Sequence, residues 1–406
     1  MRRELSRVKE PNKYDFVLLS IVGIMAILSL LAIWSAFELI TAEVPTTLLM
    51  KQVLWYVLGV ISMGAIMYLG NDTVRSFMKV TYWILIALLL YLLISKFIFT
   101  RFLGIELPFV NTVNGATSWF LFPVIGTLQP SEFMKVVLVL MCADIIDEHN
   151  SGKVIDSYES DLQLFWKIIK VAVPPMLLIF LQPDTGICII IFVSLAIMMM
   201  CSGIKKAWII CGFAAIFLIL GIFFYMYFFN NELLTSLFGS GSSYKLDRID
   251  SWLNPESDTL GKGMQLYYAL MVIGSAGLSG HGFQQFLLPI PEAQTDFIFA
   301  VIGQSWGLIG ALFTVGLCFA LDLRLIRIAM LSKNTFDKYY IIGILGMLLF
   351  QQIENIGMII GLLPITGITL PFISYGGSSL LSYFLALGVI MNASSHAKKL
   401  SDFIYN

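Results

Sequence analysis

Apolar segments of about 20 residues recur along the whole chain, and this pattern constrains the fold more than any other feature. The first, at 14–37, follows a basic N-terminus. It is too long for the core of a signal peptide and no small-residue cleavage site closes it, so we expect a retained span. Only 13% of the 406 residues are charged, against about 25% in soluble domains. The composition excludes an ordinary cytosolic enzyme and predicts an all-α, polytopic membrane protein.

The length rule predicts ten transmembrane helices within a single membrane domain, residues 1–406. Their approximate ranges are 14–37, 53–70, 80–99, 132–146, 166–182, 186–202, 207–229, 297–320, 339–361 and 377–395. The segment 264–280 is apolar but short and contains three glycines. We expect it to be re-entrant or half-buried, because such backbone is tolerated in a membrane only inside protein or beside a wet cavity.

Basic residues are distributed unequally between the two sides of these predicted spans. With a cytoplasmic N-terminus, the inner segments hold 17 Lys and Arg residues and the outer segments hold six. This bias predicts that both termini are cytoplasmic. Two large loops, about 100–131 and about 230–296 (between spans seven and eight), then lie outside, and we expect any chemistry there.

Several kinds of site are not supported by the sequence. The five cysteines lie in apolar segments, and the three histidines are far apart, without the spacing of a metal site or a disulfide framework. No nucleotide-binding loop or nucleophile elbow with a histidine partner is found. We therefore expect no dedicated metal site, no Ser-His-Asp triad and no ATP-driven pump.

The outer mouth of the fourth predicted span carries the first candidate residues. Pro130 follows Gln129 and suits the first turn of a helix. Glu132 and Lys135 are three residues apart and share a helix face. Two interpretations stay open: an interfacial ion pair, or a pair facing a polar cavity, because ionisable residues in membranes are costly and tend to mark pathways.

The large loop 230–296 mixes carboxylates and cations on the predicted outer face. Asp258 follows Asn254 and Pro255 in a segment shaped by proline and glycine. Arg248 and Lys262 are the nearby cations. Asp258 is either a turn or cap residue, or a general base among cations.

Two further acidic residues have helix-capping as their simplest interpretation. Asp184 joins two predicted spans with almost no loop and is expected to cap the second one. Thr295 or Asp296 is expected to cap the eighth span in the same way.

The ninth span and the segment after it are unusual for a membrane helix. Glu354 lies nearly two turns inside the span, where a carboxylate costs about 2.5–3.5 kcal/mol, so we expect a partner for it. The nearest polar residues in sequence are Gln351, Gln352 and Asn355. The Pro/Gly/Ser-rich run 361–379, which includes Ser374 and Ser378, must be buried or line a cavity.

Taken together, these motifs resemble the SEDS family, the shape, elongation, division and sporulation proteins of bacteria, whose members are of the RodA, FtsW and SpoVE types. The resemblance covers the whole chain. The most specific matches are 129–132 with Lys135, 254–258 with Gly261 and Gly263, 295–300, and 361–379. The residues at 364–368 resemble the RodA type more than the FtsW type.

This resemblance implies a peptidoglycan glycosyltransferase that polymerises lipid II outside the bacterial cytoplasmic membrane, in cell elongation and shape. It implies a class B penicillin-binding protein as partner and a divalent cation, Mg or Mn, as cofactor. The family's key loop aspartate falls on Asp258, which we take as the catalytic base. The candidate substrate-binding residues are Gln129, Glu132, Lys135, Arg248, Lys262, Ser374 and Ser378.

Two other functions stay open from the sequence. A lipid II flippase is one, because a ten-span bundle with an intramembrane carboxylate and interrupted helices is also typical of transporters. A catalytically weak scaffold that activates its penicillin-binding partner is the other. It would fit the departures from the family pattern at Thr117, Ser118, Gln304 and Ser305. The polar outer loop with Asp258 favours the enzyme, since transport does not require it.

Overall fold

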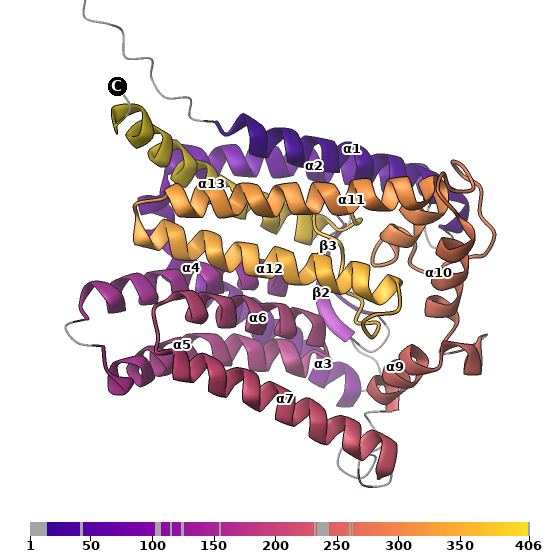
Figure 1. The fold of residues 1–406 in the computed structure, drawn as a ribbon, viewed down its shortest axis with the longest axis horizontal. Coiled ribbons are helices and arrows are strands. Elements are labelled where there is room, and N and C mark those ends of the chain that lie inside the picture. The colour runs from indigo at the N-terminus through magenta and orange to yellow at the C-terminus, as the bar shows by residue number, and fades with distance from the viewer. Residues whose placement is uncertain are drawn as a thin grey trace, which may run out of the picture.

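Long helices that run side by side dominate the computed structural model of the chain (Figure 1). It describes residues 14–40, 44–101, 107–113, 116–122, 126–153, 156–230, 233, 243–259, 261 and 263–404. A helix lies over each of the ten ranges predicted as spans. These helices are α1 (Phe16–Ser35), α2 (Pro45–Leu69), α3 (Asn71–Arg101), α4 (Pro130–Ser151), α5 (Tyr158–Leu181), α6 (Thr185–Cys201), α7 (Lys206–Phe229), α11 (Ile298–Leu331), α12 (Thr335–Ile359) and α13 (Gly377–Ile404).

Length and composition suit most of these helices to a membrane. Among the described residues, eight helices are long and apolar enough to cross one. The other two are α6, which has 17 residues, and α4, whose 22 residues include several charged ones. The polytopic helical architecture is therefore confirmed, whereas the exact number of crossings stays a prediction.

One short antiparallel sheet departs from the all-α expectation. Its strands are β1 (Val110–Val113), β2 (Ala116–Phe122) and β3 (Gly126–Leu128), in the order β1-β2-β3. Phe120 of β2 stacks on Tyr91 of α3 with ring centroids 5.8 Å apart. Strands of three to seven residues are too short for apolar periodicity to separate them from loop, so the sequence predicts only a loop here.

The described part of the segment between α7 and α11 includes three short helical elements. They are α9 (Ser243–Leu253), the 3-10 helix η3 (Pro255–Asp258) and α10 (Met264–Ser275). At 1.5 Å per residue, the 12 residues of α10 extend about 18 Å, well short of a hydrocarbon core of about 30 Å. This length is consistent with the prediction that 264–280 does not cross the membrane.

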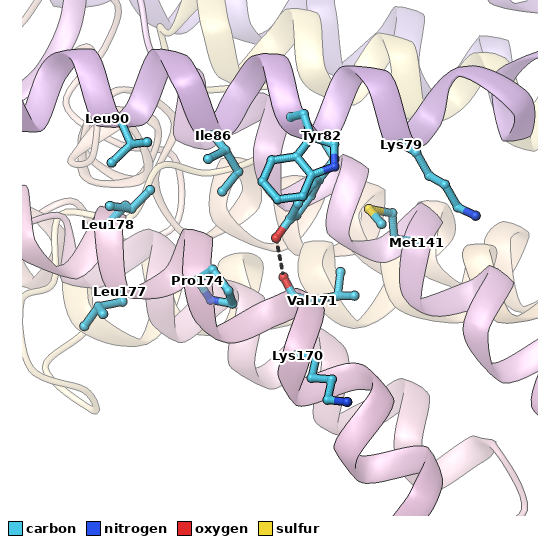
Figure 2. Close-up of a pocket in the computed structure, with 11 residues that line it drawn as sticks. Lys79, Tyr82, Ile86, Leu90, Met141, Lys170, Val171, Pro174, Leu177 and Leu178 are labelled. Atoms are coloured by element: carbon cyan, nitrogen blue, oxygen red, sulfur yellow. Dashed lines mark hydrogen bonds between the residues drawn. The ribbon is translucent and has the colours of Figure 1, made fainter.

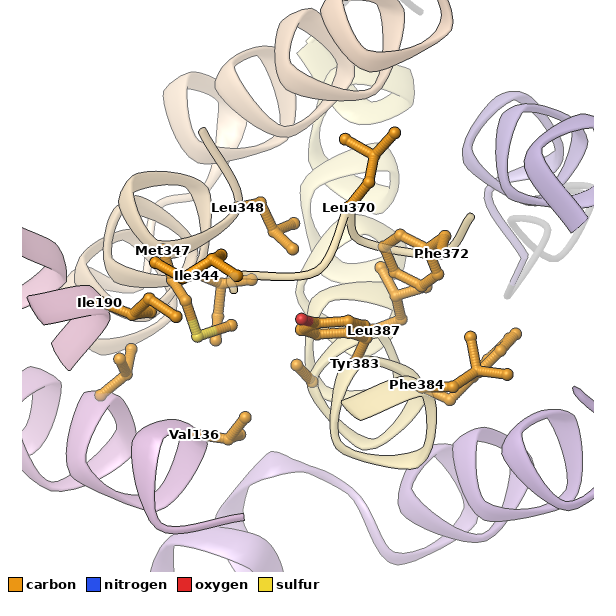
Figure 3. Packing of buried hydrophobic residues seen from close by; sticks show 14 of the residues in the cluster. Val136, Ile190, Ile344, Met347, Leu348, Leu370, Phe372, Tyr383, Phe384 and Leu387 are labelled. Carbon is orange, nitrogen blue, oxygen red and sulfur yellow. The ribbon is translucent and has the colours of Figure 1, made fainter. Parts of the chain in front are cut away.

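Among the eight helices that could cross a membrane, α12 and α13 are the best buried. Figure 3 shows apolar side chains from α4, α6 and α12 converging on α13 and on the loop before it. α13 also packs against α2, and a Cβ atom built on Gly377 would lie 2.1 Å from Cε2 of the buried Trp55 ring. By contrast, no residue of α7 is buried, as expected for a helix that is apolar on all sides and faces lipid.

A buried charge ties three helices together at the end of the bundle where α1 begins. Asp15 caps α1 by accepting from the backbone N–H of Leu18 at 3.2 Å. Arg324 of α11 donates from Nε to both Asp15 oxygens at 3.1 Å, and the Ser394 hydroxyl of α13 donates to Oδ2 at 2.8 Å. Because a buried charge is tolerated when it is paired and hydrogen-bonded, Asp15 serves the fold.

Candidate functional site

The pair Glu132 and Lys135 lies inside the protein. α4 begins at Pro130, as the sequence predicts, and its first turn places the Lys135 Nζ 2.5 Å from Glu132 Oε2. The two side chains are only 1% and 7% exposed. The interpretation as an interfacial ion pair is therefore wrong, because an interfacial pair would be solvated. A buried pair is stable only with close geometry and further hydrogen bonds.

Two other helices supply those further contacts to Lys135. Tyr383 of α13 places its hydroxyl 3.3 Å from the Lys135 Nζ and its ring centroid 4.5 Å away, which adds a cation–π interaction. The Tyr383 hydroxyl in turn donates to Oε1 of Gln351 of α12 at 2.5 Å. The contact of Lys135 with Tyr383 was not predicted, because it joins residues about 250 positions apart and leaves no local signal in the sequence.

Asp184 connects this pair to the start of α6. As predicted, it caps α6, with Oδ1 3.4 Å from the backbone N–H of Ile187. Its other oxygen accepts from Gln129 Nε2 at 2.6 Å and from the Ser131 hydroxyl at 3.2 Å. Burial raises the pKa of Asp184 to about 6, and the negative charge of Glu132 adds to this shift. These side chains form one polar cluster. We call it the α4 cluster, and its members are Gln129, Glu132, Lys135 and Asp184.

Ser374 and Ser378 are buried, and their hydroxyls form hydrogen bonds with backbone groups. The Ser378 hydroxyl donates to the carbonyl of Thr127 at 3.2 Å and accepts from the N–H of Gln129 at 2.9 Å, which joins α13 to the start of α4. The Ser374 hydroxyl accepts from the N–H of Leu370 at 2.8 Å. Ser378 therefore positions the α4 cluster, and contact of either serine with substrate stays a prediction.

Arg248 of α9 reaches a second group of polar residues. Its Nη1 donates to the carbonyl of Ile365 at 3.1 Å, and its charge acts on both Asp296 and Glu354. Burial raises the pKa of Asp296 to about 6, while a hydrogen bond from the Thr295 hydroxyl and the charge of Arg248 oppose the shift. We call Arg248, Asp296 and Glu354 the α12 cluster.

The prediction that Thr295 or Asp296 caps the eighth span is wrong. The N-cap of α11 is Phe297, with no side-chain hydrogen bond, so neither Thr295 nor Asp296 caps the helix. Asp296 is instead joined to α12 through its backbone, because the side-chain amide of Asn355 donates to the carbonyl of Asp296 at 2.7 Å.

The expected partners of Glu354 are also engaged elsewhere. Gln351 donates to the carbonyl of Met347 at 3.1 Å, Gln352 donates to Asp322 at 3.2 Å, and Asn355 binds two carbonyls. Neither carboxylate oxygen of Glu354 meets a hydrogen-bond donor in good geometry within the described part of the chain. The prediction failed for two reasons. Gln352 and Asn355 lie two residues and one residue from Glu354 and do not share its helix face. Gln351 is three residues away, but its amide is bonded to Met347 and Tyr383 instead.

Asp258 ends the 3-10 helix η3, and its side chain is exposed. Its carbonyl accepts from the N–H of Gly263 at 3.1 Å, which closes a tight turn. Its carboxylate lies against Gly261, where a Cβ atom would come within 2.2 Å of Oδ2. A side chain at 261 would therefore displace the carboxylate from this position. Lys262, the expected cation beside it, lies outside the described residues.

The positions that depart from the family pattern have structural partners inside the protein. Ser118 donates to the carbonyl of Gln182 at 3.2 Å, and Gln304 donates to the carbonyl of Gln285 at 3.1 Å. Ser305 shares a hydrogen bond of 2.8 Å with a serine of α1. These contacts explain the residue types without a role in chemistry.

The described residues do not form a ligand set for a divalent cation. No three His, Cys, Asp or Glu side chains come together there in a way that could hold a metal ion. The cation that the family resemblance implies stays a prediction, and the chemistry below uses only the chain's own side chains.

Comparison with known sequences places the chain in a family. The profile described as "Cell cycle protein", which covers FtsW, RodA and SpoVE, matches residues 13–399. The chain belongs to this family. Stage V sporulation protein E of Bacillus subtilis (strain 168) is 32% identical over 388 residues, which cover 94% of this chain and 95% of the relative. The peptidoglycan glycosyltransferase MrdB of Escherichia coli (strain K12) is 32% identical over 292 residues, covering 71% and 73%.

Solved structures agree with this FtsW/RodA/SpoVE assignment at the level of the fold. A chain from a study entitled "Structural coordination of polymerization and crosslinking by a peptidoglycan synthase complex" superposes with a TM-score of 0.73 at 24% identity, covering 95% and 98% of the two chains. RodA of Thermus thermophilus gives 0.62 at 24% identity, covering 94% and 96%. Relatives carry SpoVE, FtsW and MrdB names, so the RodA-like subtype stays a prediction.

Proposed function

We propose that this FtsW/RodA/SpoVE family member is a peptidoglycan glycosyltransferase that polymerises lipid II into glycan strands on the outer face of the cytoplasmic membrane. The observation that carries the proposal is the α4 cluster, in which a fully buried lysine is held by Glu132 and Tyr383. A charge so costly to bury is more readily explained by chemistry than by stability. Relatives named as peptidoglycan glycosyltransferases support the reaction class.

The reaction needs positive charge and a base. The hydroxyl of one sugar attacks the anomeric carbon of the other, a carboxylate takes the hydroxyl proton, and undecaprenyl diphosphate leaves. Cations stabilise the charge that develops on the departing diphosphate. Lys135 and Arg248 are the candidates among the described residues, with Glu132 orienting Lys135. Lys262 is a third candidate by sequence.

Asp258 is the proposed base. Its exposed carboxylate lies beside Gly261 at the end of η3 and is accessible to a substrate hydroxyl. A general base within reach of the proton typically raises the rate by about 10²–10⁴-fold, and we expect removal of Asp258 to lower the rate by a similar factor.

The test of the base is Asp258→Asn, which keeps the shape of the side chain. Purified protein, its penicillin-binding partner and labelled lipid II should give glycan with the wild type and at least about 10²-fold less with Asp258→Asn. Glu256→Gln is the matched control, since Glu256 is an exposed carboxylate of the same 3-10 helix, and it should retain most activity.

Two outcomes would contradict the proposal. Near wild-type polymerisation by Asp258→Asn would remove Asp258 from catalysis. A wild-type protein that makes no glycan but moves lipid II across vesicles would favour the flippase.

We further propose that the partner is a class B penicillin-binding protein and that the process is cell elongation and shape. The similarity to a chain studied in a peptidoglycan synthase complex supports an assembly of this kind. Both termini are proposed to be cytoplasmic, on the basic-residue bias. The requirement for the partner is tested by omitting it from the polymerisation assay.

A further inference from the structure

A groove runs between α3 and α5 on the outside of the bundle, and its lining shares no residue with either polar cluster. It has a volume of about 500 Å³ and is lined almost entirely by apolar atoms of these two helices (Figure 2). Three of its lining residues, Trp83, Leu90 and Leu177, are 42–67% exposed. A surface of this kind on a membrane protein faces lipid.

Two adjacent prolines leave backbone carbonyls of α5 without their helical partners beside the groove. Pro174 and Pro175 lie inside α5 and cannot donate to the carbonyls four residues earlier, those of Lys170 and Val171. The hydroxyl of Tyr82 on α3 donates to the carbonyl of Val171 at 3.0 Å, shown as the dashed line in Figure 2. A neighbouring helix thus satisfies backbone that the prolines leave open, as membrane proteins require.

The groove is polar at one end only. Lys79 of α3 and Lys170 of α5 both lie at the end marked by Tyr82 and Val171, whereas the leucines occupy the opposite end (Figure 2). Neither lysine forms an ion pair with a described residue, and Lys170 instead lies 5.2 Å from the Trp166 ring centroid. The groove therefore offers two cations beside a long apolar channel.

We propose that this groove binds an anionic glycerophospholipid, with the phosphate between Lys79 and Lys170 and an acyl chain along the leucines. Charge complementarity selects the occupant. An apolar helix of a partner protein would bury both lysines without compensation, which is costly, whereas a zwitterionic lipid brings its own cation. Basic pockets between transmembrane helices bind anionic head groups for this reason.

The position of the groove separates this lipid from the proposed substrate. Leu92 of α3 packs on the β-sheet, at the end of the bundle that carries the α4 cluster. Lys79 precedes Leu92 by 13 residues, about 20 Å along the helix at 1.5 Å per residue. The head group would therefore lie in the leaflet opposite the catalytic face, and the lipid site does not depend on the proposed function.

The test measures lipid binding to the delipidated full-length protein in detergent by native mass spectrometry. Phosphatidylglycerol should bind about tenfold or more tightly than phosphatidylcholine, because each lysine attracts the anionic head group. Lys79→Gln with Lys170→Gln should abolish this preference. Lys167→Gln is the matched control, since Lys167 is an exposed lysine of α5 that does not line the groove.

A second variant tests the acyl channel with both lysines intact. Leu177→Trp fills the apolar end and should weaken binding of phosphatidylglycerol, while thermal unfolding reports that the variant is folded. Three results would overturn the proposal: equal affinity of the wild type for the two lipids, unchanged preference in the double-lysine variant, or lysine-dependent displacement of phosphatidylglycerol by undecaprenyl diphosphate, which would make the groove a substrate site.

Discussion

Lys135 has a buried environment that allows a structural role to be tested against a catalytic one. Its ammonium is buried against Glu132 and Tyr383, so its removal would leave a buried carboxylate without its counter-charge. Breaking such a pair from one side is strongly destabilising, whereas replacing both partners by neutral groups is often close to neutral. This asymmetry separates a structural role from a catalytic one.

We expect Lys135→Met to destabilise the protein by about 3–5 kcal/mol. The double variant Glu132→Gln with Lys135→Met should recover most of that loss, because no charge is left unpaired. Thermal unfolding in detergent measures both, and the lipid II assay measures glycan. Neither variant should polymerise lipid II. If the double variant makes glycan at the wild-type rate, the pair serves stability alone.

Asp184 gives the stability of the protein a specific dependence on pH. Its pKa is raised from 3.8 to about 6, chiefly by burial. Below about pH 4 the carboxyl is protonated in the folded and unfolded states, and above about pH 6 it is ionised in both. Between these values the folded state binds more protons, so the free energy of unfolding from this group falls as pH rises.

Asp184→Asn removes that contribution. The melting temperature of the wild type relative to the variant should therefore fall between about pH 4 and about pH 6 and stay constant above that range. Thermal unfolding of both proteins across this range is the measurement. A constant difference at all pH values would show that the pKa of Asp184 is not raised.

At the scale of elements, α2 and α13 approach each other at Gly377. A side chain there would collide with the rigid, buried ring of Trp55, since the nearest ring atom is 2.1 Å from a built Cβ. At the neighbouring Gly376 the built Cβ meets only the Ser379 side chain, whose Oγ is the nearest atom at 3.4 Å. These two glycines therefore provide a matched pair of positions.

We expect Gly377→Ala to destabilise the protein by about 1–3 kcal/mol through overpacking. Gly376→Ala should stay within about 0.5 kcal/mol of wild type. Thermal unfolding of the two variants tests this. Because α13 also carries Tyr383 and Ser378, Gly377→Ala should reduce glycan synthesis as well. Equal melting temperatures for the two variants would mean that α2 and α13 move apart at little cost in the free energy of unfolding.

The elements also show what sequence could and could not predict. All ten long helices were predicted, because apolar runs of this length have few other stable forms in a membrane. The start of α4 at Pro130 and the cap of α6 at Asp184 follow from local rules and were also predicted. The contacts of Lys135 with Tyr383 and of Arg248 with Ile365 were not, since they join distant segments and depend on how the helices pack.

For the whole molecule, the proposed roles of the two polar clusters and of Asp258 require that their end of the bundle lies outside the membrane. The α4 cluster lies near the β-sheet, and the segment α9–α10 lies at the same end of the bundle (Figure 1). Lipid II polymerisation by this site requires that end to face outward. The turn between α11 and α12 lies at the opposite end and carries Ser332 and Asn334.

Single introduced cysteines test this orientation. Cys201 and Cys211 are exposed, so all five native cysteines are first replaced by serine or alanine. A thiol at Ser257, an exposed residue of η3, should react with a membrane-impermeant maleimide on intact cells. A thiol at Ser332 should react only after permeabilisation, because the 17 to six distribution of basic residues places that turn inside. The reverse pattern would place Asp258 on the cytoplasmic side, where it could not act in polymerisation outside the membrane.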